Sequence, residues 1–164
     1  MFAAVDCTGH GVPGAFMSLV GANGLDSAFS EQKTPTPGTM LDGLNKYANN
    51  SLNKSTDDSI RDGMDITLCS LNLKKMQLKF AGANNPLYLI RDGELEVFKT
   101  NKFAIGSFSE GDNNYETFEL KLKKGDKIYA FSDGYPDQFG GERGKKFLYK
   151  KFKELLVDTM KESM

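Results

Sequence analysis

The chain of 164 residues contains no tryptophan, two cysteines, one histidine and five prolines, and it lacks any long apolar run. No stretch approaches the ~20 apolar residues that a membrane helix needs, so we expect no membrane contact from this chain. Cys7 and Cys69 do not have the spacing of paired zinc ligands, which argues against a structural zinc site. No signal peptide is visible, and a reduced, cytoplasmic location is therefore expected.

An excess of charge of either sign is also missing. The net charge is -1 and the lysines are scattered, so the composition predicts no nucleic-acid partner. With 39% hydrophobic and 26% charged residues, the composition is typical of a soluble globular protein. The length fits a single domain over residues 1–164.

The first third of the chain predicts one strand and two helices. Residues 1–5 are apolar and predict a buried strand. Pro13 suits the first turn of a helix, along which Phe16, Leu19 and Phe29 recur at helical intervals. The pair Thr36 and Pro37 signals the start of a second amphipathic helix. Residues 53–62 are polar and predict a loop.

From residue 66 the apolar residues recur with a period of two, which predicts strands. Asp92 and Gly93 form a hairpin signal between two of these strands. A final helix is expected around residues 148–156. The strands are predicted at residues 66–73, 76–80, 87–91, 94–98, 118–122 and 128–131. Consecutive strands joined by short turns favour a mostly antiparallel, layered α+β fold.

Two aspartates have the same local setting. Asp6 and Asp133 each follow an apolar strand and precede a glycine-bearing turn. Two such carboxylates, brought together, would form a hard-oxygen site suited to Mg²⁺ or Mn²⁺. An aspartate at the end of a strand is equally explained as a turn former, and the residues alone leave both readings open.

A family resemblance favours the metal site. Residues 6–15, Asp-Cys-Thr-Gly-His-Gly-Val-Pro-Gly-Ala, resemble the "D-[VC]-[ST]-G-[KH]-G-V-P-A-A" segment of SpoIIE-type phosphatases. These are bacterial members of the metal-dependent (type 2C, or PPM) serine/threonine phosphatase superfamily, and many of them regulate sigma factors. Residues 81–88 look like the family's "A-G-H-x-P" loop, and residues 131–134 look like its "[TS]-D-G" strand end.

The resemblance implies a fold and a set of roles. The fold would be a four-layer α/β/β/α sandwich of two mostly antiparallel sheets flanked by helices. Asp6 would bridge two Mn²⁺ or Mg²⁺ ions, the backbone carbonyl of Cys7 would join the second ion, and Asp133 would hold the first. Gly9, Gly11 and Gly134 would permit the tight turns beside these ligands. Residues 13–53 would be a candidate regulatory face.

Two family motifs are missing. Relatives carry a "G-G-D" motif upstream and end in an "Asp-Asp" motif, and neither is present. We therefore expect a partial domain, truncated at both ends, which lacks two carboxylates and a terminal strand at each end. Open sheet edges would favour self-association, so a dimer is a possible state.

Several other residues have more than one reading. His10 could act as a general acid, but relatives often carry lysine here, so we expect it to position the turn or the substrate. Asn84 and Asn85 could bind the phosphate or a water on the metal, or simply form a turn before Pro86. Asp137 is read as a carboxylate that supports the metal ligands or as a helix cap. Residues 62–65 are read as a turn before a strand, in preference to a part of the site.

Two other catalytic chemistries fit poorly. Cys7 is not followed by the "C-x₅-R" loop of cysteine phosphatases, which argues against a cysteine phosphatase. Residues 9–14 look like a nucleotide-binding glycine loop but lack the strand–helix–strand unit and the acidic residue of that motif.

The sequence therefore predicts a metal-dependent phosphatase acting on phosphoserine or phosphothreonine. By analogy with relatives, its substrate would be a small phosphorylated regulator, such as a STAS-type anti-anti-sigma factor, attacked by a water that two metal ions activate. The alternative is a catalytically incompetent fragment that binds a regulatory partner.

Overall fold

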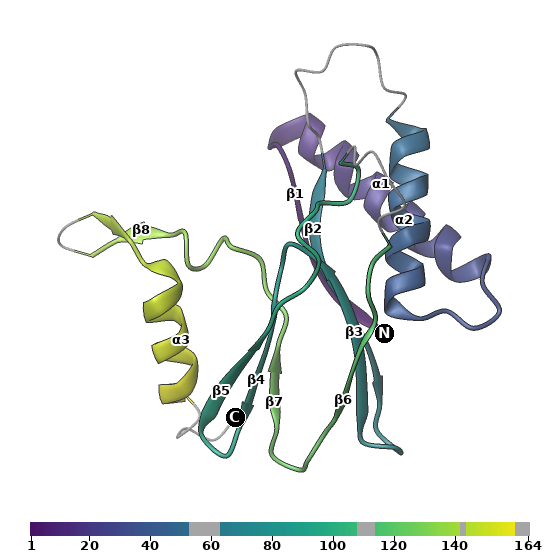
Figure 1. Cartoon of the computed structure of the whole chain (residues 1–164). Coiled ribbons are helices and arrows are strands. Elements are labelled where there is room, and N and C mark those ends of the chain that lie inside the picture. The colour runs from purple at the N-terminus through teal and green to yellow at the C-terminus, as the bar shows by residue number, and fades with distance from the viewer. Residues whose placement is uncertain (53–62, 108–113, 142–143, 160–164) are drawn as a thin grey trace.

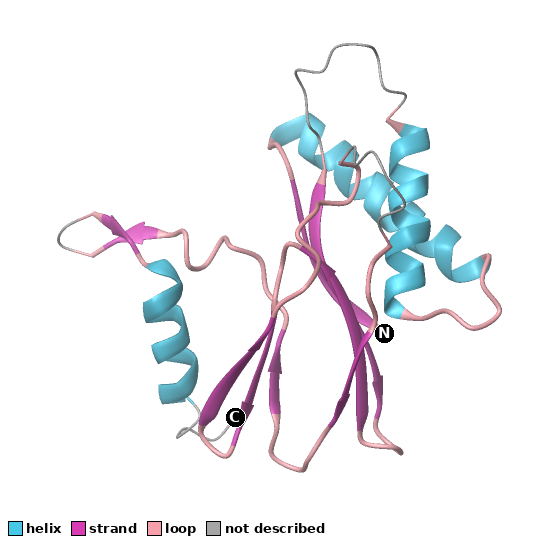
Figure 2. Ribbon diagram, viewed as in Figure 1, coloured by secondary structure: helices cyan, strands magenta, loops and turns pink. Residues whose placement is uncertain are grey.

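The computed structural model describes residues 1–52, 63–107, 114–141 and 144–159. Figure 1 shows α1 and α2 together against one sheet, with α3 on the opposite side of the molecule against a second sheet. The order of layers is therefore helix, sheet, sheet, helix, as the α/β/β/α expectation required (Figure 2). Within the described residues, no helix is long and apolar enough to cross a membrane.

All strand pairs within the two main sheets are antiparallel. The first sheet has the order β1-β2-β3-β6 and the second the order β5-β4-β7. The strands of the first sheet are β1 (Phe2–Cys7), β2 (Met64–Asn72), β3 (Gln77–Ala83) and β6 (Phe118–Lys121). Those of the second are β4 (Leu87–Arg91), β5 (Glu94–Phe98) and β7 (Lys127–Tyr129). Asp92 and Gly93 have positive φ values and close the β4–β5 hairpin, as predicted.

Three helices flank these sheets: α1 (Gly11–Ser30), α2 (Pro37–Ser51) and α3 (Leu148–Asp158). The predicted start of α2 is confirmed. The Thr36 hydroxyl accepts a hydrogen bond from the Thr39 amide, and the Thr39 hydroxyl accepts one from the Thr36 amide. This reciprocal capping satisfies two amides of the first turn, and Pro37 needs no partner there.

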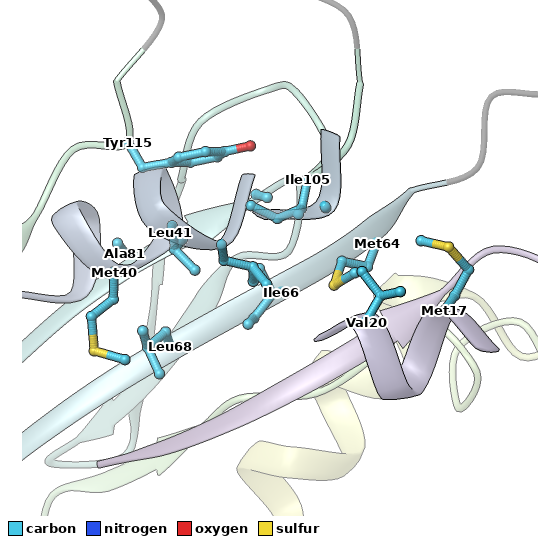
Figure 3. Packing of buried hydrophobic residues seen from close by; sticks show 13 residues of the cluster. Met17, Val20, Met40, Leu41, Met64, Ile66, Leu68, Ala81, Ile105 and Tyr115 are labelled. Carbon is cyan, nitrogen blue, oxygen red and sulfur yellow. The ribbon is translucent and has the colours of Figure 1, made fainter. Parts of the chain in front are cut away.

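Three apolar cores fill the spaces between the four layers. The largest lies between α1, α2 and the first sheet, where Leu41 and Ile66 are fully buried (Figure 3). The second lies between the sheets and is centred on Phe80, whose ring stacks on Phe118. In the third, Phe152 of α3 packs beneath β4. The molecule therefore holds its sheets together by burial on both faces.

Two apolar segments are less buried than their sequence predicts. Met1 and, in β1, Phe2 and Val5 are exposed, so the prediction of a buried strand at residues 1–5 is wrong. The reason is that β1 is an edge strand, paired only with β2. Helix α1 begins at Gly11, two residues before Pro13.

The apolar stripe of α1 is also different from the expected one. Phe16, Leu19 and Phe29 are more than half exposed, whereas the buried residues of this helix are Met17, Val20, Gly21, Gly24 and Ala28. The glycines explain the choice of face. A Cβ on Gly24 would lie 2.6 Å from Leu44 Cδ1, so only a helix without side chains there can approach α2 this closely.

The region after β7 holds the remaining differences. Strand β7 ends at Tyr129, not at residue 131, and Phe131 leads into an irregular turn. An unpredicted pair follows, β8 (Phe139–Gly140) and β9 (Lys145–Lys146), which lies beside the start of α3 (Figure 1). The predicted loop at residues 53–62 lies outside the described residues.

Candidate functional site

Asp6 is held near the end of β1 by the pairing of that strand with β2. The register places Asp6 directly opposite Asp65. Just beyond, the Thr8 amide donates to the Gly63 carbonyl at 2.9 Å, and the Gly63 amide donates to the Thr8 hydroxyl, also at 2.9 Å. These bonds connect the chain after Asp6 to the start of β2, so the Asp6 backbone is fixed from both sides.

Asp133 reaches the same place from the second sheet. It stands in the turn that follows β7 and is exposed. Burial raises the pKa of Asp6, and the charge of Asp133 and a hydrogen bond between the two carboxyls raise it further. The Ser132 hydroxyl opposes this by donating a hydrogen bond to Asp6. The structure therefore brings together the two aspartates that the sequence singles out.

A third carboxylate, Asp65, lies beside this pair. Its charge also raises the pKa of Asp6, and its Oδ1 accepts a hydrogen bond of 2.8 Å from Asn84 Nδ2. Asn84 itself has a positive φ of 59°, in a turn that directs its side chain toward β2. The sequence predicts a turn at residues 62–65, but Asp65 is part of β2. The sequence signal for Asp65 is a charged residue between the apolar residues Met64 and Ile66, and the structure buries both of these neighbours fully.

The glycine turn after Asp6 agrees only in part with expectation. Gly9 and Gly11 have φ values of 85° and 65°, a region that glycine occupies without strain. His10 between them is exposed and stands at the N-cap of α1, where its side chain makes no capping bond. Gly134 has no positive φ, and a Cβ there would lie 3.4 Å from Ser132 Oγ, so the turn after Asp133 does not require glycine.

The remaining predicted site residues lie around this centre. The Cys7 thiol faces α1, where it accepts a hydrogen bond from Ser18 Oγ at 3.8 Å. Asn85 is 7% exposed, and its backbone carbonyl accepts hydrogen bonds from Thr67 and Thr100. Asp137 forms a 2.7 Å ion pair with Lys146 of β9 and donates its amide to the Asp133 carbonyl. Asp137 therefore supports the turn that carries Asp133.

One residue near the site was not predicted. Burial raises the pKa of Tyr149, and the charges of Asp133, Asp137 and Asp65 raise it further. The first turn of α3 thus lies within electrostatic reach of the carboxylates. No sequence pattern indicates this tyrosine, because its position depends on how α3 packs on the second sheet.

The donor set fits a hard divalent cation. Asp6 and Asp133 offer oxygen ligands, and their mutual contact is unfavourable when both are ionised. A cation held between them would remove that repulsion. Among the described residues, no three His, Cys, Asp or Glu side chains meet closely enough to surround one ion. The site is therefore suited to Mg²⁺ or Mn²⁺ retaining several waters, and not to an ion enclosed by side chains.

Comparisons with known proteins place this chain in a family. The family model for Stage II sporulation protein E (SpoIIE) matches residues 1–164. The SiaA PP2C domain of Pseudomonas aeruginosa is 32% identical, with a TM-score of 0.82 over 98% of this chain and 61% of that one.

Two further solved structures share the fold. The SpoIIE phosphatase and regulatory fragment of Bacillus subtilis has a TM-score of 0.66 at 19% identity, over 99% of this chain and 42% of that chain. The RsbU and RsbW domains of a Mycobacterium tuberculosis protein give 0.68 at 19% identity, over 96% and 41%. A search of curated proteins found no match. The chain thus spans 61% or less of the length of these three structures.

Proposed function

The chain belongs to the SpoIIE family, and from this premise we propose that it supplies part of a phosphatase that hydrolyses phosphoserine or phosphothreonine on a protein. The observation that carries the proposal is the meeting of Asp6 and Asp133. Asp6 belongs to β1 of the first sheet and Asp133 to the turn after β7 of the second, yet their carboxyls interact through a hydrogen bond. If this contact served only to stabilise the fold, uncharged residues would serve better than two acidic groups, so the pair indicates a functional site.

Asp6, Asp133 and the backbone carbonyl of Cys7 would hold two Mn²⁺ or Mg²⁺ ions. When bound, such ions lower the pKa of a water molecule toward neutrality and offset charge on a phosphoryl group. The chain's own part is to keep these oxygens in place. The β1–β2 pairing orients Asp6, and the Ser132 hydroxyl keeps an oxygen of Asp6 fixed by donating to it. Asn84 does the same for Asp65.

The substrate we propose is a small phosphorylated regulatory protein, such as a STAS-type anti-anti-sigma factor. Support for this comes from the family alone, since the described residues carry no signature of one partner. Exposed groups around Asp133 are consistent with a protein substrate, because this carboxylate lies at the surface and not in a deep pocket. Asn85, by contrast, is buried and is assigned a structural role.

A second candidate function is that of a partner-binding domain without activity. It is favoured by the small number of side chains that could surround an ion in the described residues. The two functions differ in one measurable property, which is turnover that depends on a divalent metal.

The test is hydrolysis of a phosphoserine peptide with Mn²⁺, with Mg²⁺ and with EDTA. We expect turnover with either ion, none with EDTA, and a loss of at least about 10³-fold in Asp6→Asn. The matched control is Asp92→Asn in the β4–β5 turn, where the positive φ of 52° suits asparagine. Turnover that survives in Asp6→Asn contradicts the assignment of Asp6. No turnover with either ion contradicts activity in this chain and favours the partner-binding function.

A further inference from the structure

A hollow opens next to the candidate site, between the turn after Asp133, the β8–β9 pair and α3. Its volume is about 500 Å³. It is lined chiefly by three aromatic residues, two lysines and a glutamine: Tyr135, Phe139, Phe147, Lys145, Lys151 and Gln138. We refer to it as the lysine–aromatic hollow. The proposed function makes no use of it.

The aromatic wall of the hollow is held rigidly by the third core. The Tyr135 ring packs edge-on against Phe147, with centroids 5.6 Å apart, and also contacts the buried Phe152 at 5.3 Å. Nevertheless Tyr135 is 54% exposed and Phe139 is 69% exposed. A large aromatic side chain that packs on a core and is open to solvent, as Tyr135 is, is typical of the contact points of protein interfaces.

The lysines give the hollow a positive charge. Lys145 and Lys151 are both exposed, and no acidic residue belongs to the described lining. Neighbouring Lys146 differs, because Asp137 pairs with it at 2.7 Å. In the part of the chain that the structure describes, Lys145 and Lys151 form no ion pair. A ligand with carboxylates would therefore find two unpaired ammonium groups beside an apolar wall.

The chain segment that lines one side of the hollow begins next to the candidate site. Tyr135 is two residues beyond Asp133, and the Asp137 amide donates to the Asp133 carbonyl at 2.9 Å. Tyr149, which lies between the lining residues Phe147 and Lys151 in the sequence, is within electrostatic reach of Asp133. A chain segment lying in the hollow would thus lead directly to the carboxylates.

We propose that the lysine–aromatic hollow docks an acidic segment of the protein substrate, close in sequence to its phosphorylated serine or threonine. Glutamate or aspartate side chains would pair with Lys145 and Lys151, and an apolar side chain would rest on Tyr135 and Phe139. This proposal rests on the proposed function for the identity of the partner. It accounts for how a shallow metal site could distinguish one phosphoprotein from another.

A single-stranded nucleic acid fits the hollow less well. Bases could stack on Tyr135 and Phe139, but such ligands need a basic track along the backbone. Here the described lining offers only two unpaired lysines, which is too few to follow successive phosphates along a strand. An acidic peptide requires only the two lysines.

Binding is measured first, without metal, so that the result does not depend on catalysis. The probe is a fluorescent twelve-residue peptide with a central serine, flanked by three glutamates and one leucine. Its match carries glutamine for each glutamate. Fluorescence anisotropy with the whole chain in EDTA should show about tenfold tighter binding of the glutamate peptide. The preference should vanish in K145E/K151E and persist in K74E/K75E, a control that reverses two exposed lysines of the β2–β3 turn.

Equal affinity for the two peptides, or an unchanged preference in K145E/K151E, overturns the proposal. So does tighter binding of a twelve-residue oligothymidylate that is lost in the same variant, because the hollow would then serve nucleic acid. Both lysines are exposed, so the variant should fold. Its circular dichroism and Tm are compared with those of the parent, and K145A/K151A provides a milder change.

Turnover of the phosphorylated peptides with Mn²⁺ then separates docking from catalysis. In K145E/K151E the KM for the glutamate phosphopeptide should rise about tenfold, while hydrolysis of p-nitrophenyl phosphate stays unchanged. If the proposed function is wrong but the docking proposal is right, neither the phosphopeptides nor p-nitrophenyl phosphate would be hydrolysed, while the chain would still bind the glutamate peptide more tightly than the glutamine peptide. A fall in p-nitrophenyl phosphate hydrolysis equal to that for the peptide would contradict docking.

Discussion

Replacing Asp65 by asparagine tests the third carboxylate of the site. Asp65 faces Asp6 across the β1–β2 pair and accepts a hydrogen bond of 2.8 Å from Asn84 Nδ2. Asparagine keeps a side-chain oxygen that can accept this bond, so the change removes the negative charge and little else. Two opposite effects are expected, one without metal and one with it.

Without metal, the variant should be more stable than the parent. Like charges directly opposite each other on paired strands destabilise by about 0.2–1 kcal/mol, and Asp65 is one of the two charges that raise the pKa of Asp6. For a chain of this size, relief of about 0.5 kcal/mol should raise Tm by about 1–2 °C in EDTA. With metal, the lost anion no longer attracts the cation, and groups that support metal ligands typically contribute about 10–100-fold in affinity.

The two effects are measured by thermal unfolding in EDTA and by calorimetric titration with Mn²⁺. Asp92→Asn, which removes a charge far from the site, serves as the control. Asp65→Ala is compared as well, because it leaves the Asn84 amide without its partner and should lose stability instead of gaining it. An unchanged Mn²⁺ affinity together with an unchanged Tm would refute the reasoning, since Asp65 would then not influence the site.

Two further predictions concern the frame that carries the site. In Gly38→Ala the new Cβ would lie 2.3 Å from the Tyr115 carbonyl oxygen. Urea unfolding should therefore show a free energy of unfolding lower by about 1–2 kcal/mol, a net value that includes the gain in helix propensity. The control Asn50→Ala should leave the free energy of unfolding nearly unchanged. Asp126 has its pKa lowered by hydrogen bonds from Arg91, so its stabilisation is complete above the ordinary pKa near 3.8 and is lost as pH falls through the lowered value. The stability difference between the parent and Asp126→Asn should thus be constant above about pH 5 and shrink below about pH 4; a difference that grows on acidification would contradict this ion pair.

The layered fold could be predicted because its signals are local. The alternation of apolar residues, the Asp92–Gly93 turn and the Thr36 cap each depend on neighbours a few residues away, and each is found as expected. The face that α1 buries could not be predicted in this way. Phe16 and Leu19 have the stronger apolar character, but the close approach of α2 selects the side on which Gly24 lies.

The register of β1 with β2 is a second limit of the sequence. Whether Asp65 lies opposite Asp6 depends on a pairing between segments 59 residues apart, and a slip of one residue would turn one of the two side chains to the other face. Nothing in the local pattern fixes that register, so Asp65 looked like part of a turn. The bonds between Thr8 and Gly63 fix it in the folded chain.

The two aspartates of the site are positioned by different kinds of local structure, and this explains why the setting of Asp6 could be predicted more fully than that of Asp133. Asp6 lies within a regular strand, so the glycine pattern after it was enough to predict its setting. Asp133 follows a strand of three residues, and its turn is supported by the ion pair between Asp137 and Lys146 of a strand pair too short to predict. The same short pair forms one wall of the lysine–aromatic hollow. The part of the site that sequence patterns describe least is thus the part where we expect the chain to contact its partner, because surface turns held by side-chain bonds can vary without disturbing the sheets.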